Sequence, residues 1–195
     1  MTENTRRVVV TGLGLVSPVG SALDKAWGNI KNGVSGIRKI ESFDASSFSV
    51  QISGSVIDFN ADDYISPKDQ KKMDTFIHYG IGASVMAIND SGLEITDENR
   101  DRIGISIGSG IGGLPYIERN YGNFLNKGPR KISPYFVPSS IINMVSGNLS
   151  IMYGITGPNM SLVSACATGT HSIGDAARLI TVSYTHLTLP TKRIV

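Results

Sequence analysis

Residues 103–113 read Ile-Gly-Ile-Ser-Ile-Gly-Ser-Gly-Ile-Gly-Gly, an apolar alternation that runs directly into a glycine-rich turn. Isoleucine at every second position predicts a strand with one apolar face, and the glycine and serine residues between them leave the second face almost without bulk. Strand and helix patterns alternate along the rest of the chain. This order predicts an α/β domain with a largely buried sheet.

Apolar runs and turn-forming residues set the approximate limits of the other elements. Residues 8–10 predict a buried first strand, and residues 50–56 and 160–162 predict two further strands. Helices are recognised by the spacing of their apolar residues and by the capping residues at their ends. The expected helices lie, in order, at residues 21–33, 66–92 and 138–154 and from residue 164 onward.

The composition is that of an ordinary globular protein, because 41% of the 195 residues are apolar and 17% are charged. No unbroken apolar stretch is long enough to cross a membrane. The formal net charge of +2 comes from Lys192 and Arg193, without which the chain is neutral. Neither nucleic acid nor an anionic membrane is therefore an expected partner. The single cysteine excludes an internal disulfide framework and is typical of a cytoplasmic protein.

The glycine-rich turn at residues 108–113 also matches the G-x-G-x-x-G pattern of dinucleotide sites. Such a site needs an acidic residue about 20 positions later, and residues 127–134 contain none. We therefore favour close backbone packing near a ligand as the role of these glycines. The sequence contains neither a Walker A motif nor the cysteine and histidine spacing of metal sites, so no bound cofactor or metal is expected.

Cys166 is the candidate nucleophile, although the residues alone leave an alternative open. If Ser164 caps the last helix, the thiol lies in the first turn, where the helix dipole favours a thiolate. Free backbone N–H groups there could receive the oxyanion of an attacked thioester. The alternative is a small apolar residue buried in a helix of small residues. His171 lies about 140° around the helix axis from Cys166, so we interpret His78 and His171 as packed, hydrogen-bonded residues.

Three lysines, Lys68, Lys71 and Lys72, share one face of the first turns of the helix expected at residues 66–92. Cations at this end oppose the helix dipole and therefore do not stabilise the helix. Either these lysines form a solvated face, or an anionic partner binds there.

Four segments carry a resemblance to a known family. They are residues 7–14 (Arg-Val-Val-Val-Thr-Gly-Leu-Gly), 108–113, 128–134 (Gly-Pro-Arg-Lys-Ile-Ser-Pro) and 165–169 (Ala-Cys-Ala-Thr-Gly). Together they resemble the β-ketoacyl-acyl-carrier-protein synthases, and among these the synthase II branch of bacterial type II fatty acid synthesis. The resemblance implies a thiolase-like fold, of which residues 1–181 form the N-terminal half only, and a homodimer.

The resemblance also implies roles for individual residues. Cys166 would take an acyl chain from the phosphopantetheine arm of acyl carrier protein, with no cofactor bound to the enzyme itself. Malonyl-acyl-carrier protein would then be decarboxylated and attack the Cys166 thioester, which lengthens the chain by two carbons. Ile111 matches the residue that gates the acyl pocket, and Phe136 lies where the family lines that region near the dimer interface. The residues that match carrier-protein docking positions are Lys68, Lys71, Lys72, Arg130 and Lys131.

The sequence departs from the family pattern at its C-terminal end. The catalytic lysine, the two catalytic histidines and the second oxyanion donor of the family lie beyond residue 181, and residues 182–195 match nothing in the family. We therefore expect residues 182–195 to be an unrelated tail. We also expect the 195-residue chain to be inactive by itself.

Three other functions compete with this interpretation. A related enzyme, such as synthase I or a polyketide ketosynthase, is less favoured because Ile111 within Gly-Ile-Gly-Gly is typical of synthase II. A non-catalytic partner subunit of a ketosynthase would lack the nucleophilic Cys166. A nicotinamide oxidoreductase depends on the glycine pattern at residues 108–113 alone.

Overall fold

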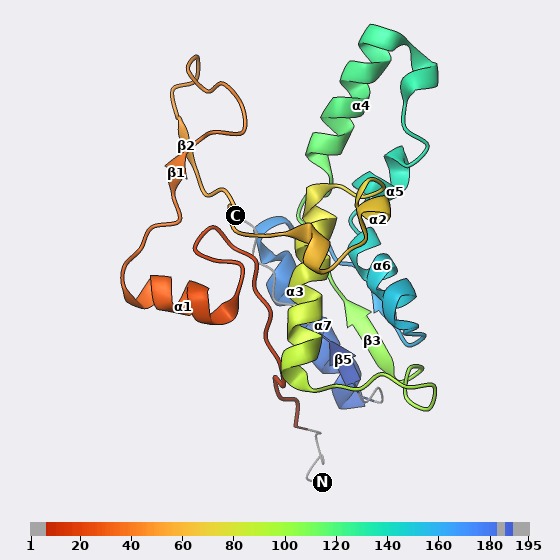
Figure 1. Cartoon of the computed structure of the whole chain (residues 1–195). Coiled ribbons are helices and arrows are strands. Elements are labelled where there is room, and N and C mark those ends of the chain that lie inside the picture. Colours follow the sequence, from red (N-terminus) through yellow and green to blue (C-terminus); the bar gives the residue numbers. More distant parts are fainter. Residues whose placement is uncertain (1–6, 183–185, 189–195) are drawn as a thin grey trace.

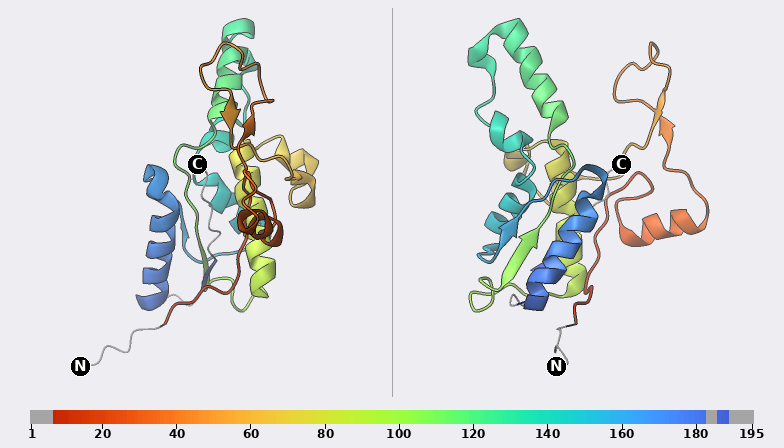
Figure 2. Two further views of the ribbon diagram at one scale, coloured as in Figure 1. Left: turned by 90° about the vertical axis from the view of Figure 1, so that its left-hand side faces the viewer. Right: turned by 180° about the vertical axis from the view of Figure 1, so that it is seen from behind.

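The computed structural model describes residues 7–182 and 186–188 (Figure 1). Its centre is a three-stranded parallel sheet in the order β4–β3–β5, formed by Asn159–Met160, Ile103–Ser106 and His186–Thr188. Helix α7 lies on one face of this sheet and helix α3 on the other, as Figure 2 shows, and α6 packs beside α3. This arrangement confirms the predicted α/β class. The three helices are α3 (Thr75–Ser91), α6 (Met144–Tyr153) and α7 (Thr168–Val182).

Strand β3 is buried along its whole length, as its sequence pattern predicts. It is held in register with β4 by pairs such as Ile105 with Asn159, and it also pairs in parallel with β5. The small residues of its second face let α7 approach closely. Ser106 Oγ therefore donates a hydrogen bond to the Ser172 carbonyl oxygen at 3.3 Å. The face that carries almost no bulk is thus covered by the last helix.

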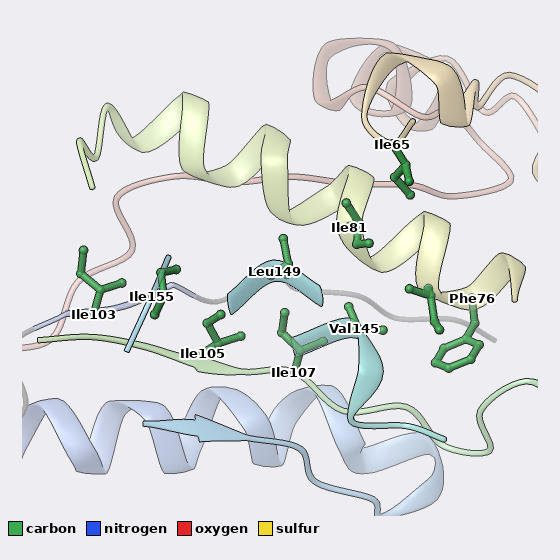
Figure 3. Packing of buried hydrophobic residues seen from close by; sticks show 10 residues of the cluster. Ile65, Phe76, Ile81, Ile103, Ile105, Ile107, Val145, Leu149 and Ile155 are labelled. Atoms are coloured by element: carbon green, nitrogen blue, oxygen red, sulfur yellow. The ribbon is translucent and has the colours of Figure 1, made fainter. Parts of the chain in front are cut away.

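The hydrophobic core lies between β3, α3 and α6 (Figure 3). Most of its members are aliphatic, and full burial of such a side chain contributes about 1.5–3 kcal/mol relative to exposure. The buried members of this cluster are Ile65, Phe76, Ile77, Ile81, Ile103, Ile105, Ile107, Val145, Leu149 and Ile155.

The prediction of a single helix over residues 66–92 is wrong, because the structure has two helices there, α2 (Pro67–Gln70) and α3. Asp74 begins α3 afresh, since its carboxylate accepts a hydrogen bond from the Thr75 backbone N–H. A polar side chain that caps a helix in this way competes with continuation of the preceding turn. The predicted end at Gly92 is confirmed by its left-handed backbone, with φ of +64°.

The helix expected over residues 138–154 is also divided, into α5 (Phe136–Ser140) and α6. The chain becomes extended at Ile141, where φ is −81° and ψ is 144°. The Ser140 carbonyl oxygen accepts a hydrogen bond from the Gly113 N–H at 2.9 Å, in place of a partner in a following helical turn. A long-range contact therefore ends α5.

The first strand predicted at residues 8–10 is wrong. Val9 and Val10 are 58% and 76% exposed and lie outside the sheet. Both edges of β3 are occupied by β4 and β5, so β3 has no edge left for the N-terminal segment. This segment instead runs along α3, where a Cβ on Gly12 or Gly14 would strike the helix backbone (Figure 1).

Helix α1 (Leu23–Lys31) and a small antiparallel hairpin project from the rest of the molecule (Figure 1). The hairpin consists of β1 (Arg38–Lys39) and β2 (Ile52–Ser53), so the strand predicted at residues 50–56 is confirmed for two residues only. No helix in the described ranges is long and apolar enough to cross a membrane. The remaining elements are α4 (Leu114–Lys127), η1 (Ala61–Asp63), η2 (Pro129–Lys131) and η3 (Ala165–Ala167).

Residues 182–195, expected to be an unrelated tail, are described in part. The structure places Val182 at the end of α7 and residues 186–188 in β5, parallel to β3. Residues 183–185 and 189–195 lie outside the described part of the chain. The boundary at residue 181 and the unrelated character of this tail stay predictions.

Candidate active site

Cys166 lies in the connection between β4 and α7, and it is exposed. It is the central residue of the 3-10 turn η3, which precedes α7, so the expected place in the first turn of α7 is wrong. Ala165, directly before the cysteine, has a φ of +49° and is the one non-glycine residue with positive φ among the described residues. A side chain at this φ strains the backbone, and such strain clusters at functional sites.

The side chain of Ser164 makes no capping hydrogen bond, so the condition considered in the sequence analysis, a cap at Ser164, is not met. The Ser164 hydroxyl instead hydrogen-bonds to Nδ1 of His171 at 2.6 Å, which draws the side chain away from the N–H groups of the turn. The predicted hydrogen-bonded role of His171 is confirmed, although the residue is exposed and not packed. His78 is also hydrogen-bonded, with Nε2 at 3.2 Å from the Gln70 carbonyl oxygen.

Thr168, the first residue of α7, closes the turn around the cysteine. Its hydroxyl accepts a hydrogen bond from the Ser164 backbone N–H at 2.9 Å and donates one to the Ala165 carbonyl oxygen at 2.8 Å. The residue is 5% exposed, and both bonds are partly buried. One buried hydroxyl therefore joins the strained alanine to the residue before it.

The glycine-rich turn at residues 108–113 packs directly against the cysteine turn. A Cβ on Gly108 would strike the methyl group of Thr168. One on Gly110 would lie 3.3 Å from the Ala165 carbonyl oxygen. The glycines therefore serve the close backbone packing that the sequence analysis favoured over a dinucleotide site.

Ile111 follows Gly110 in this turn, and it is 70% exposed. The next residue, Gly112, has a φ of +92° and lies against the Ser140 carbonyl oxygen at the end of α5. Phe136 is the first residue of α5 and is half-buried. Ile111 thus lies between the cysteine turn and the helix that carries Phe136, a placement compatible with the gating and pocket-lining roles predicted for them.

The basic residues predicted to dock a carrier protein differ in their surroundings. Lys72 Nζ bonds to Asp69 Oδ1 at 2.7 Å. The hydrogen bonds from Lys72 and Ser66 lower the pKa of Asp69, and the bond to Asp69 raises the pKa of Lys72. The positive charge of Lys72 is therefore balanced by the negative charge of Asp69. Lys68 lies in α2, and Arg130 lies in η2.

Lys71 and Lys131, by contrast, line one hollow of about 560 Å³ between α4 and the start of α3. Arg119 of α4 lines the same hollow, and its guanidinium carbon lies 4.8 Å from the centroid of the Tyr116 ring. Arg119 was not predicted from the sequence, and neither was the helix that carries it, α4. The hydrogen bond from the Tyr116 N–H to Asp74, at the start of α3, and the packing of α4 against η2 place Arg119 with the two lysines.

The chemistry available at this site is that of one accessible thiol. A thiol becomes a strong nucleophile as its thiolate, and the backbone N–H groups of its turn are potential donors to an oxyanion. Over residues 7–182 and 186–188, no group of three His, Cys, Asp or Glu residues is placed to hold a metal ion.

Comparison with known proteins identifies the family. The profile of the beta-ketoacyl synthase N-terminal domain matches residues 5–186. Proteins named 3-oxoacyl-acyl-carrier-protein synthase 2 from Vibrio harveyi, Coxiella burnetii and Staphylococcus aureus (strain N315) are 57%, 51% and 44% identical to this chain. The matches cover 90%, 90% and 92% of this chain but 42%, 42% and 43% of the relatives. The chain therefore spans less than half the length of the curated relatives it matches.

Solved structures show the same fold. The ishigamide ketosynthase/chain length factor is 26% identical with a TM-score of 0.81, and the match covers 91% of this chain and 44% of that one. AntDE:AntF, a type II polyketide synthase acyl-carrier protein in complex with its ketosynthase, is 26% identical with a TM-score of 0.74, over 90% of this chain and 47% of that one. These neighbours confirm the predicted thiolase-like fold, in its N-terminal half only. The chain belongs to the beta-ketoacyl synthase family.

Proposed function

We propose that this chain is the nucleophile-bearing part of a 3-oxoacyl-acyl-carrier-protein synthase that elongates fatty acids. The observation that carries the proposal is the exposed Cys166 in a strained turn between β4 and α7. Relatives at 44–57% identity, named synthase 2, support this activity over that of the polyketide ketosynthases, whose solved structures are 26% identical. A non-catalytic partner subunit is not supported, because the cysteine is present.

The proposed reaction has two steps. The Cys166 thiolate attacks the carbonyl carbon of an acyl thioester on the phosphopantetheine of acyl carrier protein, and the phosphopantetheine thiolate leaves and takes up a proton. Malonyl-acyl-carrier protein then loses carbon dioxide, and the resulting carbanion attacks the Cys166 thioester. The new carbon–carbon bond gives a 3-oxoacyl chain two carbons longer on the second carrier protein, and the Cys166 thiolate is released.

Each step places negative charge on a thioester oxygen and therefore needs hydrogen-bond donors. We assign the backbone N–H of Cys166 to the oxyanion of the Cys166 thioester, since the Ala167 N–H of the same turn already donates to the Ser164 carbonyl oxygen at 3.0 Å. The donors that assist decarboxylation are proposed to lie in the part of the relatives that this chain does not cover. His171 does not replace them in this proposal, because its Nδ1 is bonded to Ser164.

The carrier protein is proposed to dock at the hollow lined by Lys71, Arg119 and Lys131. Three cations at one site attract an acidic surface and raise the rate of encounter. The solved complex AntDE:AntF, in which a type II polyketide synthase acyl-carrier protein is bound to its ketosynthase, supports a partner of this kind. Because the acyl chain arrives on the partner's phosphopantetheine, the reaction needs no cofactor bound to the synthase, and we place the enzyme in the cytoplasm.

We also propose that the protein acts as a homodimer. Helix α4 exposes a row of large apolar side chains, whereas monomeric proteins rarely expose large contiguous apolar patches. A second copy packed on this face would cover them. Leu125→Glu in a full-length synthase should therefore give monomers in sedimentation analysis, while an unchanged dimer would place the interface elsewhere. The exposed apolar residues of α4 are Leu114, Ile117, Tyr121, Phe124 and Leu125.

Ile111 is proposed as the gate of the acyl pocket, with Phe136 in its lining. A larger side chain at the exposed position of Ile111 would narrow the entrance. Ile111→Trp should therefore slow acylation by long acyl chains more than by short ones, measured as the ratio of the two rates. An unchanged ratio would remove Ile111 from this role.

The test of the function is formation of an acyl adduct in a full-length synthase that carries this domain. Incubation with acyl-acyl-carrier protein should add the mass of the acyl group, and malonyl-acyl-carrier protein should then discharge it with release of 3-oxoacyl product. Cys166→Ala should form no adduct on intact-mass analysis. Persistence of the adduct in that variant would contradict the assignment of Cys166.

A further inference from the structure

The turn that carries Cys166 combines one strained residue with one buried hydroxyl. At φ of +49°, the Cβ of Ala165 crowds its own backbone, so a residue other than glycine adopts this conformation at a cost. Such conformations persist where the surrounding contacts over-determine them. The conformational strain at Ala165 must therefore be offset by contacts that hold the turn in place.

Thr168 holds the turn through two groups: its backbone N–H donates to the Ala165 carbonyl oxygen, and its Oγ1 makes hydrogen bonds on both sides of Ala165. Oγ1 accepts from the Ser164 N–H at 2.9 Å, before Ala165, and donates to the Ala165 carbonyl oxygen at 2.8 Å, after it. The peptide group is planar, so a fixed Ala165 carbonyl also fixes the N–H and Cα of Cys166. Thr168 itself is buried, and both of its hydroxyl bonds are partly buried, which limits competition from water.

The methyl group of Thr168 holds the hydroxyl in this direction. It lies against Gly108 of the glycine-rich turn, where a Cβ would strike it. Threonine is branched at Cβ and stiff at χ1, so the position of its methyl group determines that of its hydroxyl. The glycine-rich turn that follows β3 therefore sets the rotamer of Thr168, the residue that closes the cysteine turn.

We propose that Thr168 is the positioning residue for Cys166, since its hydroxyl sets the Ala165–Cys166 peptide and thereby the direction in which the thiol is presented. The acyl-transfer part of this inference rests on the proposed function. The orientation of the Cys166 thiol, by contrast, can be measured through its alkylation, without an acyl substrate.

Two comparisons isolate the effect of the hydroxyl. In the first, wild type is compared with Thr168→Val, which replaces the hydroxyl by a methyl group. In the second, Thr168→Ser, which keeps the hydroxyl, is compared with Thr168→Ala, which lacks it. In a full-length synthase that carries this domain, loss of the hydroxyl should slow alkylation of Cys166 by iodoacetamide and acyl transfer from acyl-acyl-carrier protein by about tenfold or more. The KM for the carrier protein should stay unchanged. Thr168→Ser, which keeps the hydroxyl, should stay within about twofold of wild type. If Thr168→Val does not fold, the serine and alanine pair decides the question.

Ala176→Gly is the matched control for stability, because Ala176 is buried in α7 away from the cysteine turn. It should lower the melting temperature without changing either rate. Equal rates within both pairs would overturn the positioning role, and so would a rate loss in Ala176→Gly as large as that in Thr168→Val. Hydroxyl-dependent alkylation in a protein that accepts no acyl chain would uphold the positioning role and contradict the proposed function.

Discussion

The hydroxyl of Ser164 lies 2.6 Å from Nδ1 of His171, so a bond spans the turn that holds Cys166. It ties the first turns of α7 back to the residue that enters η3. One ring nitrogen of the nearest histidine in the sequence is therefore engaged by a serine. We therefore predict that His171 supports the structure of the turn and does not take the proton of the thiol.

Replacing His171 by Gln should accordingly slow acyl transfer to Cys166 by less than about threefold, because loss of a general base costs on the order of a hundredfold or more. Single-turnover acylation of a full-length synthase by acyl-acyl-carrier protein measures this rate. A loss on the order of a hundredfold would instead identify His171 as the general base.

Asp74 should be among the more costly residues to replace outside the core. Its carboxylate caps α3 and also accepts a hydrogen bond from the Tyr116 N–H of α4 at 2.7 Å, and Asp74 is buried. Asp74→Ala removes the cap and leaves a buried donor without a partner, which should lower the free energy of unfolding by about 2–4 kcal/mol. Urea denaturation measures this loss. Asp97→Ala, which breaks only an exposed pair with Arg100, should change stability little.

Gly108→Ala should disturb the cysteine turn. The added Cβ would strike the Leu162 carbonyl oxygen and the methyl group of Thr168, and overpacking of this kind costs about 1–3 kcal/mol. Both the melting temperature and the alkylation rate of Cys166 should fall. Gly122→Ala in α4 meets no neighbouring atom and should stabilise the helix by about 0.5–1 kcal/mol. Similar effects of the two substitutions would contradict the packing described for Gly108.

Short sequence patterns correctly predicted the elements that depend on interactions between residues close together in the chain. The alternation at residues 103–107 predicted β3, and Gly92 predicted the end of α3, because a buried strand and a left-handed cap each impose a residue type. The start of α3 was not predictable from spacing, because Asp74 also serves a donor 42 residues away. The strand expected at residues 8–10 failed because an apolar run does not show whether a sheet edge is open to it.

The candidate site, like the fold, was predictable from the sequence only in part. Cys166 and the glycines at residues 108–113 have distinctive motifs, which a resemblance can recognise. Arg119 has none, because its place in the hollow depends on how α4 packs. The two hydrogen bonds of Thr168 depend on a 3-10 turn that helical periodicity does not distinguish from a helix start.

Lys71→Ala should raise the KM for acyl-acyl-carrier protein more than Lys72→Ala does. Lys72 is bonded to Asp69 at 2.7 Å, whereas Lys71 lines the hollow. The difference should grow at low salt, where exposed charges are least screened. Steady-state kinetics at two salt concentrations measure it. A small thioester that lacks the carrier protein should be used equally by all three proteins, and losses with that substrate would indicate a folding defect instead.

Asp58 should make the attachment of α1 dependent on pH. Its Oδ1 accepts from the Ser21 hydroxyl and its Oδ2 from the Lys25 ammonium, each at 2.7 Å. Partial burial acts to raise the pKa of Asp58, but these bonds outweigh it and leave the pKa below its ordinary value of 3.8. The stabilisation by the carboxylate is therefore complete above this ordinary value and is lost as the pH falls through the lower folded-state pKa.

Asp58→Asn should thus lower the melting temperature at pH 7, and the gap to wild type should close as the solution is acidified below the ordinary pKa of 3.8. Thermal unfolding followed by circular dichroism across this range provides the comparison. A gap that stays constant with pH would show that the carboxylate charge does not hold α1.

The pairing of β3 with β4 has a consequence for the order of events during synthesis. Ile105 lies opposite Asn159, so the sheet cannot begin on this side until all the residues between them have left the ribosome and the loop has closed. Helix α3 precedes β3 in the chain and is complete when the strand emerges. During that interval the isoleucines of β3 have α3 to pack against, and the helix shields a strand with two open edges from pairing with other nascent chains.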